Sequence, residues 1–260
     1  MAIVGLDGYI NGIKQDITWM KTGTRTLVAA MPYTIFDIAG NPGAGVLNVG
    51  NTANGLVPTD AVAGYPLIAN FSGEGAITNI SYSSSVACRL FVFDRLFVAG
   101  AYAFNADVTL TSQPSYSARV PDDNYNGLQL WIEAVTAFTG VCNVNIDYLD
   151  QDGNAGNTGA VATLALPLGR CYQLPLEAGD AGITQIVRVR GTTATAGTFN
   201  VMGLRPLWKG RVYAANFGDI HDFLKTGMRR IYQDSAIYTL IAADSTAVGL
   251  PDMVIQVTSA

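Results

Sequence analysis

Apolar and polar residues alternate in short runs along most of the chain from residue 76 onward. In the run NVNIDYLD at 143–150, the apolar residues Val144, Ile146 and Tyr148 alternate with the polar residues Asn143, Asn145 and Asp147. The run IVRVRG at 186–191 sets two valines against two arginines in the same way. A period of two is the pattern of a β-strand that is buried on one face.

Gly, Pro, Asn or Asp bounds each of these runs, as turns require. The runs that we interpret as strands are AITNIS, VACRLFVFDRLF, ADVTLTS, NGLQLWIEAVTAF, CNVNIDYL, AVATLAL, CYQLPL, ITQIVRVRG and GTFNVMGL. No helical pattern separates them, so an antiparallel sheet is favoured over a parallel one. The sequence predicts a mainly β protein with little helix, whose body over 71–205 is an antiparallel, jelly-roll-like β-sandwich.

The first seventy residues have a different pattern, and we expect 1–70 to form an extended N-terminal arm. Over 6–21, isoleucine and methionine recur at helical spacing, which predicts a short amphipathic helix. Between about 38 and 65 the chain is rich in Gly, Pro, Asn and Ala and has neither period. Such a segment lies over its own fold or against a neighbouring subunit. Because it has few large apolar side chains to offset the entropy of ordering, we expect a neighbour to contribute.

The final segment, 206–260, is expected to pack on the body or on a neighbouring subunit. Apolar residues at helical spacing predict a short helix over 219–232, although Gly227 interrupts the pattern. The strand-like runs YTLIAA and MVIQVT follow.

Charge and composition exclude several classes of function. The chain has 260 residues, of which 49% are hydrophobic and 13% charged, and its formal net charge is -5. This balance disfavours a nucleic-acid partner, which needs a basic surface. No apolar run is long enough to span a membrane, and Asp7 interrupts any secretory core, so we expect neither a membrane protein nor export by a signal sequence. Cys88, Cys142 and Cys171 are scattered, which is typical of buried, reduced thiols.

Candidate catalytic groups are few. His221 is the one histidine in the sequence, and we expect it in a capping or surface role near a helix start. Asp122 with Asp123, or Asp94 with Glu133, offers a pair of carboxylates for glycoside hydrolysis, but an Asp-Asp-Asn run is also ordinary turn chemistry.

The sequence also contains candidate residues for calcium binding and for sugar stacking. Asp147, Asp150, Asp152 and Asn154 supply oxygen ligands around Gly153, as a calcium loop does. The bidentate Glu that an EF-hand needs is missing, because position 159 is Gly, so we expect a polar connection between strands. Exposed aromatic rings would indicate sugar stacking, but Trp131 and Tyr148 fall within strand patterns and are expected in the core.

Several local signatures occur in a distinctive order. They are FDRLF at 93–97, LQLWIEAVTAFTG at 128–140, YLDQDGNAG at 148–156, PLEAGDAGI at 175–183, RPL at 205–207 and the later run TGMRRIYQDSAIYTLI. Over roughly residues 40–245 the sequence resembles a family of tailed-bacteriophage virion structural proteins. Members of that family carry these segments in the same order, often with an Arg where this chain has Asn157.

The resemblance implies a non-enzymatic component of the phage head, made in the host cytoplasm. It implies a decoration or cement protein that binds major capsid subunits and copies of itself, as a homotrimer or another cyclic oligomer. A tail-fibre or receptor-binding β module that recognises host saccharide is the alternative. We assign no catalytic, cofactor-binding or metal-binding residue, and we expect no nucleic-acid or membrane partner.

Overall fold

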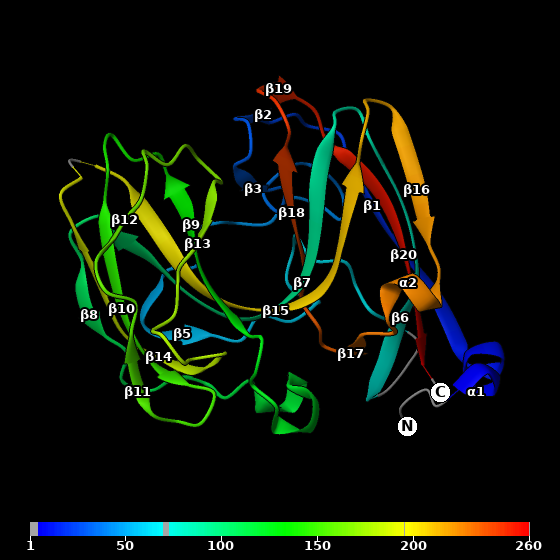
Figure 1. Ribbon diagram of the computed structural model, residues 1–260, viewed down its shortest axis with the longest axis horizontal. Coiled ribbons are helices and arrows are strands. Elements are labelled where there is room, and N and C mark those ends of the chain that lie inside the picture. Colours follow the sequence, from blue (N-terminus) through cyan, green and yellow to red (C-terminus); the bar gives the residue numbers. More distant parts are fainter. Residues whose placement is uncertain (1–4, 70–72, 195, 260) are drawn as a thin grey trace. The chain divides into compact units, whose positions relative to one another are not determined.

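The computed structural model describes residues 5–69, 73–194 and 196–259, and its regular structure is almost entirely β-strand (Figure 1). The strands pair antiparallel. The predicted class, mainly β with an antiparallel sandwich arrangement and little helix, is therefore confirmed.

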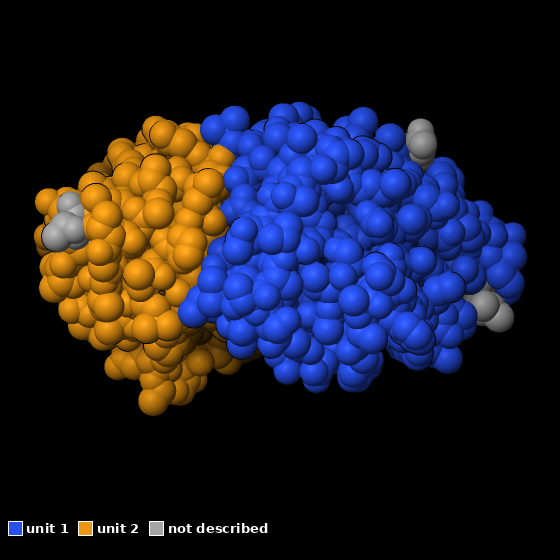
Figure 2. All heavy atoms as spheres, turned by 90° about the horizontal axis from the view of Figure 1, so that it is seen from above, with its two compact units in different colours: residues 1–46, 59–94, 207–260 blue, residues 47–58, 95–206 orange. Residues whose placement is uncertain are grey.

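The chain divides into two compact units, coloured separately in Figure 2. Unit 1 comprises 1–46, 59–94 and 207–260, and unit 2 comprises 47–58 and 95–206. Each unit has a hydrophobic core of its own. The chain enters unit 2 for residues 47–58 and returns to unit 1 for 59–94. It passes to unit 2 again within β7 (Cys88–Ala103) and returns to unit 1 within β15 (Thr198–Val212).

This division differs from the segments that the sequence suggests. The chain returns to unit 1 between residues 206 and 207, and residue 70 lies inside unit 1. Unit 1 joins strands from both ends of the sequence, because β20 (Pro251–Ser259) lies between β1 (Ile13–Lys21) and β6 (Glu74–Ser84). Pairing over such a separation leaves no local signal in composition.

Unit 1 contains two groups of strands around one core. The first sheet has the order β16 (Phe217–His221), β6, β20, β1 and β4 (Gly40–Asn41), with β17 (Arg230–Tyr232) also on β6. The second group pairs β18 (Ile237–Ala243) with β3 (Pro32–Thr34) and with the first part of β7. The short strands β2 (Thr26–Leu27) and β19 (Ala247–Val248) pair with each other. Ile17, Ile255 and Ile80 form a buried cross-strand row.

Both predicted helices are largely wrong. Helix α1 covers only Gly5–Asn11, and the rest of the predicted segment is strand β1. Ile17, Trp19 and Lys21 are buried at a period of two, while Met20, which the helical pattern would bury, is exposed. The isoleucines fit both periods, and pairing with β20 decides between them.

The predicted C-terminal helix is reduced to a single turn between two short strands. Residues 219–232 contain the end of β16, the single turn α2 (Phe223–Thr226) and β17. Asp222 caps α2, and Gly227 ends it in the left-handed region with φ 64. Of the apolar residues at helical spacing, Ile220 and Ile231 lie in β16 and β17, which both pair with β6, and the others lie in α2 or in the turn after it.

The extended segment 38–65 makes contacts with its own chain, and the contribution of a neighbouring subunit stays a prediction. Leu47 and Tyr65 are buried, and Tyr65 lies against Phe36 with ring centroids 4.7 Å apart. The Asn200 amide donates to the Leu47 carbonyl at 2.7 Å, and the Tyr102 hydroxyl donates to Thr52 at 2.7 Å. These backbone hydrogen bonds supply contacts that a count of apolar side chains omits.

Unit 2 is also built from two groups of strands. One sheet has the order β11 (Ala155–Asn157), β10 (Asn143–Asp150), β14 (Ile183–Thr192) and β8 (Asp107–Thr109), with β12 (Val161–Ala162) also on β10. In the other group β9 (Gln129–Thr136) pairs with β13 (Cys171–Gln173) and β15, and β5 (Asn51–Leu56) pairs with β7. The 3-10 turns η1 (Ser117–Arg119) and η2 (Pro121–Asp123) lie between β8 and β9.

The alternation predicted for β10 is confirmed. Buried and half-buried residues alternate along the whole strand. In β14 the alternation is interrupted, because the register to β10 shifts between Arg188 and Ile186. Val187 is therefore an extra residue in a bulge and is only half-buried. The polar side chains of β10 and β14 are left on the outer face of this sheet.

Candidate interaction surface

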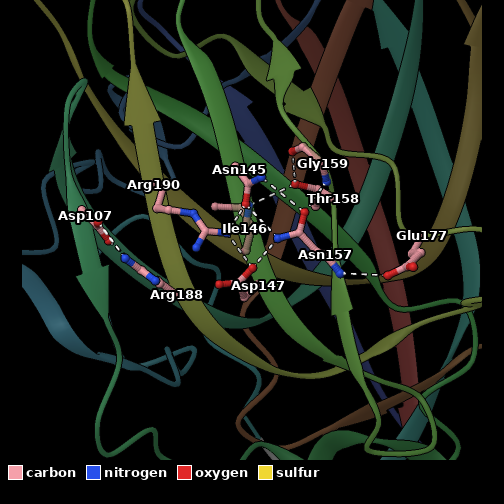
Figure 3. Close-up of polar contacts among 10 residues, drawn as sticks. All are labelled: Asp107, Asn145, Ile146, Asp147, Asn157, Thr158, Gly159, Glu177, Arg188 and Arg190. Carbon is pink, nitrogen blue, oxygen red and sulfur yellow. Dashed lines mark hydrogen bonds and ion pairs between the residues drawn. The ribbon is translucent and has the colours of Figure 1, made fainter.

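The outer face of the unit 2 sheet carries a connected group of polar side chains (Figure 3). Arg190 on β14 donates to Asp147 on β10 at 2.7 Å and also to Asn145. Asn157 on β11 donates to Asn145 at 2.9 Å and also to Asp147. Because residues at alternate positions of neighbouring strands share a face, the four side chains meet directly. We call Asn145, Asp147, Asn157 and Arg190 the polar cluster.

An exposed ion pair lies beside the polar cluster. Arg188 on β14 donates two hydrogen bonds to the Asp107 carboxylate on β8, at 2.7 and 2.8 Å. The hydrogen bond from Arg188 holds the pKa of Asp107 below its ordinary value. Arg188 and Arg190 each pair with an aspartate, so the positive charges of these two arginines are balanced on this face.

The predicted calcium ligands do not converge on one point. Asp147 contributes to the polar cluster, while Asp150 accepts hydrogen bonds from the backbone N–H groups of Asp152 and Asn154, both at 2.8 Å. Burial alone would raise the pKa of Asp150, but hydrogen bonds led by those from Asn154 outweigh it and keep the pKa below its ordinary value. The residues that the structure describes contain no group of three or more His, Cys, Asp or Glu side chains placed to hold a metal ion.

The candidate carboxylates for hydrolysis are engaged separately. Asp94 accepts from the Ser235 hydroxyl at 2.8 Å and from the Ala236 N–H at 3.1 Å within unit 1. Glu133 lies in unit 2, where Arg95 pairs with it at 3.0 Å. Asp122 and Asp123 lie in turn η2, with φ 55 and φ 51, and their side chains are exposed. The geometry around each of these carboxylates is that of a structural or turn residue.

His221 is not a helix cap, because Asp222 takes that place. It ends β16 and packs against two aromatic side chains. Trp208 Nε1 lies 2.9 Å from His221 Nδ1, and the Tyr82 hydroxyl lies 3.2 Å from His221 Nε2. The sequence gives no signal for these contacts, since the three residues are far apart along the chain.

The other residues singled out from the sequence lie in the core. Trp131 and Tyr148 are buried, as expected, so neither presents a ring for sugar stacking. The Tyr148 hydroxyl donates to Asp180 at 2.6 Å. Cys88, Cys142 and Cys171 are buried free thiols, which also agrees with the sequence.

The segments that carry the family resemblance contact one another in pairs. Arg95 of the FDRLF segment forms the buried ion pair with Glu133 of LQLWIEAVTAFTG. Gln151 of YLDQDGNAG accepts hydrogen bonds from Ala181 at 2.8 Å and Gly182 at 3.2 Å, both in PLEAGDAGI. Four of the segments therefore form two contacting pairs within unit 2.

Unit 1 has an exposed apolar groove on its first sheet. The residues that line the groove include Ser81 and Ser83 of β6 and Gly218 of β16. Its sides include Val254 and Ile220, which flank Ser81 in one cross-strand row. Both side chains are exposed. Exposed apolar groups gathered on one sheet are typical of contact surfaces between proteins.

No protein-family model and no curated protein matches the chain. Among solved structures, that of the infectious bursal disease virus Gx strain is 10% identical, with 95% of this chain and 80% of that chain covered and a TM-score of 0.23. The VP2 subviral particle of infectious bursal disease virus is 9% identical, with the same coverage and a TM-score of 0.23. At these TM-scores neither likeness carries a conclusion about fold or function.

In the described part of the chain, no helix has the length and apolar character needed to cross a membrane.

Proposed function

We propose that the protein is a non-enzymatic structural component of a tailed-phage particle, and specifically a capsid decoration or cement protein. It binds major capsid subunits and copies of itself in a homotrimer or another cyclic oligomer. The observation that carries this proposal is the pairing of the family segments. Arg95 meets Glu133, and Gln151 meets the Ala181–Gly182 turn, so the residues behind the resemblance act together in the fold.

The chemistry of the candidate site residues supports a structural role. Asp94, Glu133 and Asp150 each accept hydrogen bonds from neighbouring groups of their own unit. A general acid or base needs a proton-transfer group that reaches a substrate in a cleft. These carboxylates are instead used to hold strands and turns in place.

The surface chemistry supports contact with other protein subunits. Only 13% of the residues are charged, and the arginines of the polar face are paired with aspartates. The apolar groove of unit 1 adds exposed Val254 and Ile220. Low charge and exposed apolar groups favour broad protein contacts over nucleic-acid binding.

The test is co-sedimentation of the purified protein with phage shells assembled without it. We expect saturable binding at a fixed ratio to the major capsid protein, and no hydrolysis of glycan, peptide or nucleic acid above background. Failure to bind such shells, together with binding to isolated tails or to host saccharide, would favour the receptor-binding alternative. Hydrolysis that Asp122→Asn or Asp123→Asn abolishes would overturn the structural role.

A further inference from the structure

The contacts of His221 restrict its protonation state. Its ring meets Trp208 and Tyr82 edge-on, with centroids 5.4 and 5.3 Å away. Tyr82 and Trp208 are 4% and 7% exposed, so the imidazole is held against a buried surface of unit 1. The Trp208 indole nitrogen, 2.9 Å from His221 Nδ1, carries a hydrogen that can only be donated. His221 Nδ1 must therefore offer a lone pair, and the ring is neutral with its proton on Nε2.

Protonation of Nδ1 would place two N–H donors opposite each other, and the hydrogen bond would be lost. We propose that His221 is a pH-sensitive latch, which ties the end of edge strand β16 to Trp208 of β15 at neutral pH and releases it on acidification. Imidazole groups ordinarily change charge between about pH 5 and 8, so this range spans the switch. The proposal stands independently of the role in a virion.

Charged and titratable side chains lie close to His221. Asp219 Oδ2 lies 3.5 Å from His221 Nε2, and Lys225 of α2 lies 3.9 Å from the same carboxylate oxygen. Asp222, the next residue along the chain, is occupied as the helix cap. The hydrogen bond from the Ile220 N–H, with smaller contributions from Lys225 and His221, keeps the pKa of Asp219 below its ordinary value. Asp219 therefore remains anionic as His221 gains a proton.

The remaining neighbours do not titrate over the same range. Burial, followed by the nearby charge of Asp219, raises the pKa of Tyr82 above its ordinary value, and Tyr213 adds to this effect. The phenol of Tyr82 therefore stays neutral and accepts from His221 Nε2–H in both states of the ring. On acidification His221 thus keeps Asp219 and Tyr82 as partners and loses Trp208.

The latch controls an exposed edge of the unit 1 sheet. Strand β16 is at the end of the sheet order and pairs with β6. Phe217 and Ile220 on it are 66% and 60% exposed. The Ile220 N–H donates to Asp219 Oδ1 at 2.8 Å, so a side chain of the strand itself covers one backbone donor. Loss of the Trp208 contact removes the hydrogen bond from the His221 end of β16 to β15, so the strand becomes easier to detach from β6.

The experiment is an NMR titration of the full chain from pH 8 to pH 5, with 15N-labelled histidine and tryptophan. The sequence has one histidine, so every imidazole signal belongs to His221. The Trp208 indole signal is assigned by comparison with Trp208→Phe. We expect the Nε2–H tautomer at pH 8 and a shift of the Trp208 indole N–H with the same midpoint as the imidazole. After correction for the intrinsic pH dependence, hydrogen exchange of the β16 amides should be faster by about fivefold, as for the loss of one hydrogen bond.

His221→Gln is the matched variant, because glutamine can accept from Trp208 through its side-chain oxygen but does not titrate. In His221→Gln the Trp208 indole signal and the exchange of the β16 amides should be constant over the same pH range. In Tyr82→Phe the indole signal should still shift with pH, as in the unmodified chain. A Trp208 indole signal that does not move as His221 titrates would overturn the proposal. The same pH-dependent shift of the indole signal in His221→Gln would also overturn it. If His221→Gln does not fold, the titration of the unmodified chain decides alone.

Discussion

Arg95 and Glu133 form an ion pair in the core of unit 2, with Arg95 Nη2 3.0 Å from Glu133 Oε2 and side chains 1% and 0% exposed. The Asn200 amide donates to the same carboxylate oxygen at 2.8 Å. Arg119 donates to the backbone carbonyl of Arg95 at 3.0 Å. The pair thus connects β7, β9 and β15 with turn η1, which places two segments of the family resemblance at the centre of one unit.

Glu133→Gln should lower the free energy of unfolding by about 3–5 kcal/mol, because it removes the negative charge that pairs with the Arg95 guanidinium in the core. The double variant Arg95→Met/Glu133→Leu should lower the free energy of unfolding much less, since it removes both charges. Chemical denaturation of the three proteins measures the difference.

The exposed pair Arg188 and Asp107 provides the matched control. Both side chains are largely in solvent, so Asp107→Asn should leave the free energy of unfolding unchanged within error. If Glu133→Gln changed the free energy of unfolding no more than Asp107→Asn does, the buried pair would not stabilise the fold.

Lys21 should make stability depend on pH in the alkaline range. Its ammonium group donates to the Pro42 carbonyl at 2.7 Å, and burial lowers its pKa from 10.5 to about 8, against the opposing effect of Asp37. The unfolded chain then binds a proton more tightly than the folded chain between about pH 8 and 10.5. Below this pH range, burial of the charged Lys21 ammonium lowers the stability of the folded chain by its full cost. The cost disappears as pH rises through the range, because Lys21 loses its charge.

The measurement is the difference in unfolding free energy between the natural chain and Lys21→Met at pH 7 and at pH 10. The natural chain should gain stability relative to the variant at pH 10. The comparison removes the contribution of buried tyrosines, which both proteins share. A difference that is constant with pH would contradict the lowered pKa.

Calcium should have little effect on thermal stability. Asp150 Oδ1 accepts from the backbone N–H groups of Asp152 and Asn154, and Oδ2 accepts from the Asn154 side-chain amide. Asp147 is paired with Arg190. We therefore expect the melting temperature in calcium and in EDTA to differ by no more than ~2 °C, which is below the shift that a saturated site would give. A larger, saturable rise that Asp152→Asn removes would identify a metal site.

The segment 47–58 should resist proteolysis in an isolated monomer. It pairs through β5 with β7, and Leu47 and Thr52 accept hydrogen bonds from Asn200 and Tyr102. Limited proteolysis read by mass spectrometry, on a sample shown to be monomeric, tests this. Rapid cleavage at these residues in the monomer, with protection only in assembled particles, would support the expectation that a neighbouring subunit orders the arm.

The strand content of the protein could be predicted from the sequence because one-sided burial imposes a period of two. β10 follows this pattern along its whole length. The segment 13–21 was ambiguous, since Ile13 and Ile17 fit both a helix and a strand, and the choice depends on β20 at the other end of the chain. The two units could not be predicted for the same reason.

The candidate sites were predictable mainly where they depend on local turn chemistry. The loop at Asp150 has the polar connection expected from its Asp, Gly and Asn residues. The polar cluster was only partly visible, because alternation places Asn145 and Asp147 on one face but does not show that Asn157 joins them. The contacts of His221 with Trp208 and Tyr82 depend on strands that meet only in the fold.

The most direct test of the proposed function is the number of copies of this chain in each mature phage particle, measured by quantitative mass spectrometry against the major capsid protein. A decoration or cement protein occupies symmetry-related positions over the whole shell, so the account predicts hundreds of copies in a fixed ratio to the major capsid protein. A few copies per particle, or copies that remain with the tail when heads and tails are separated, would contradict it.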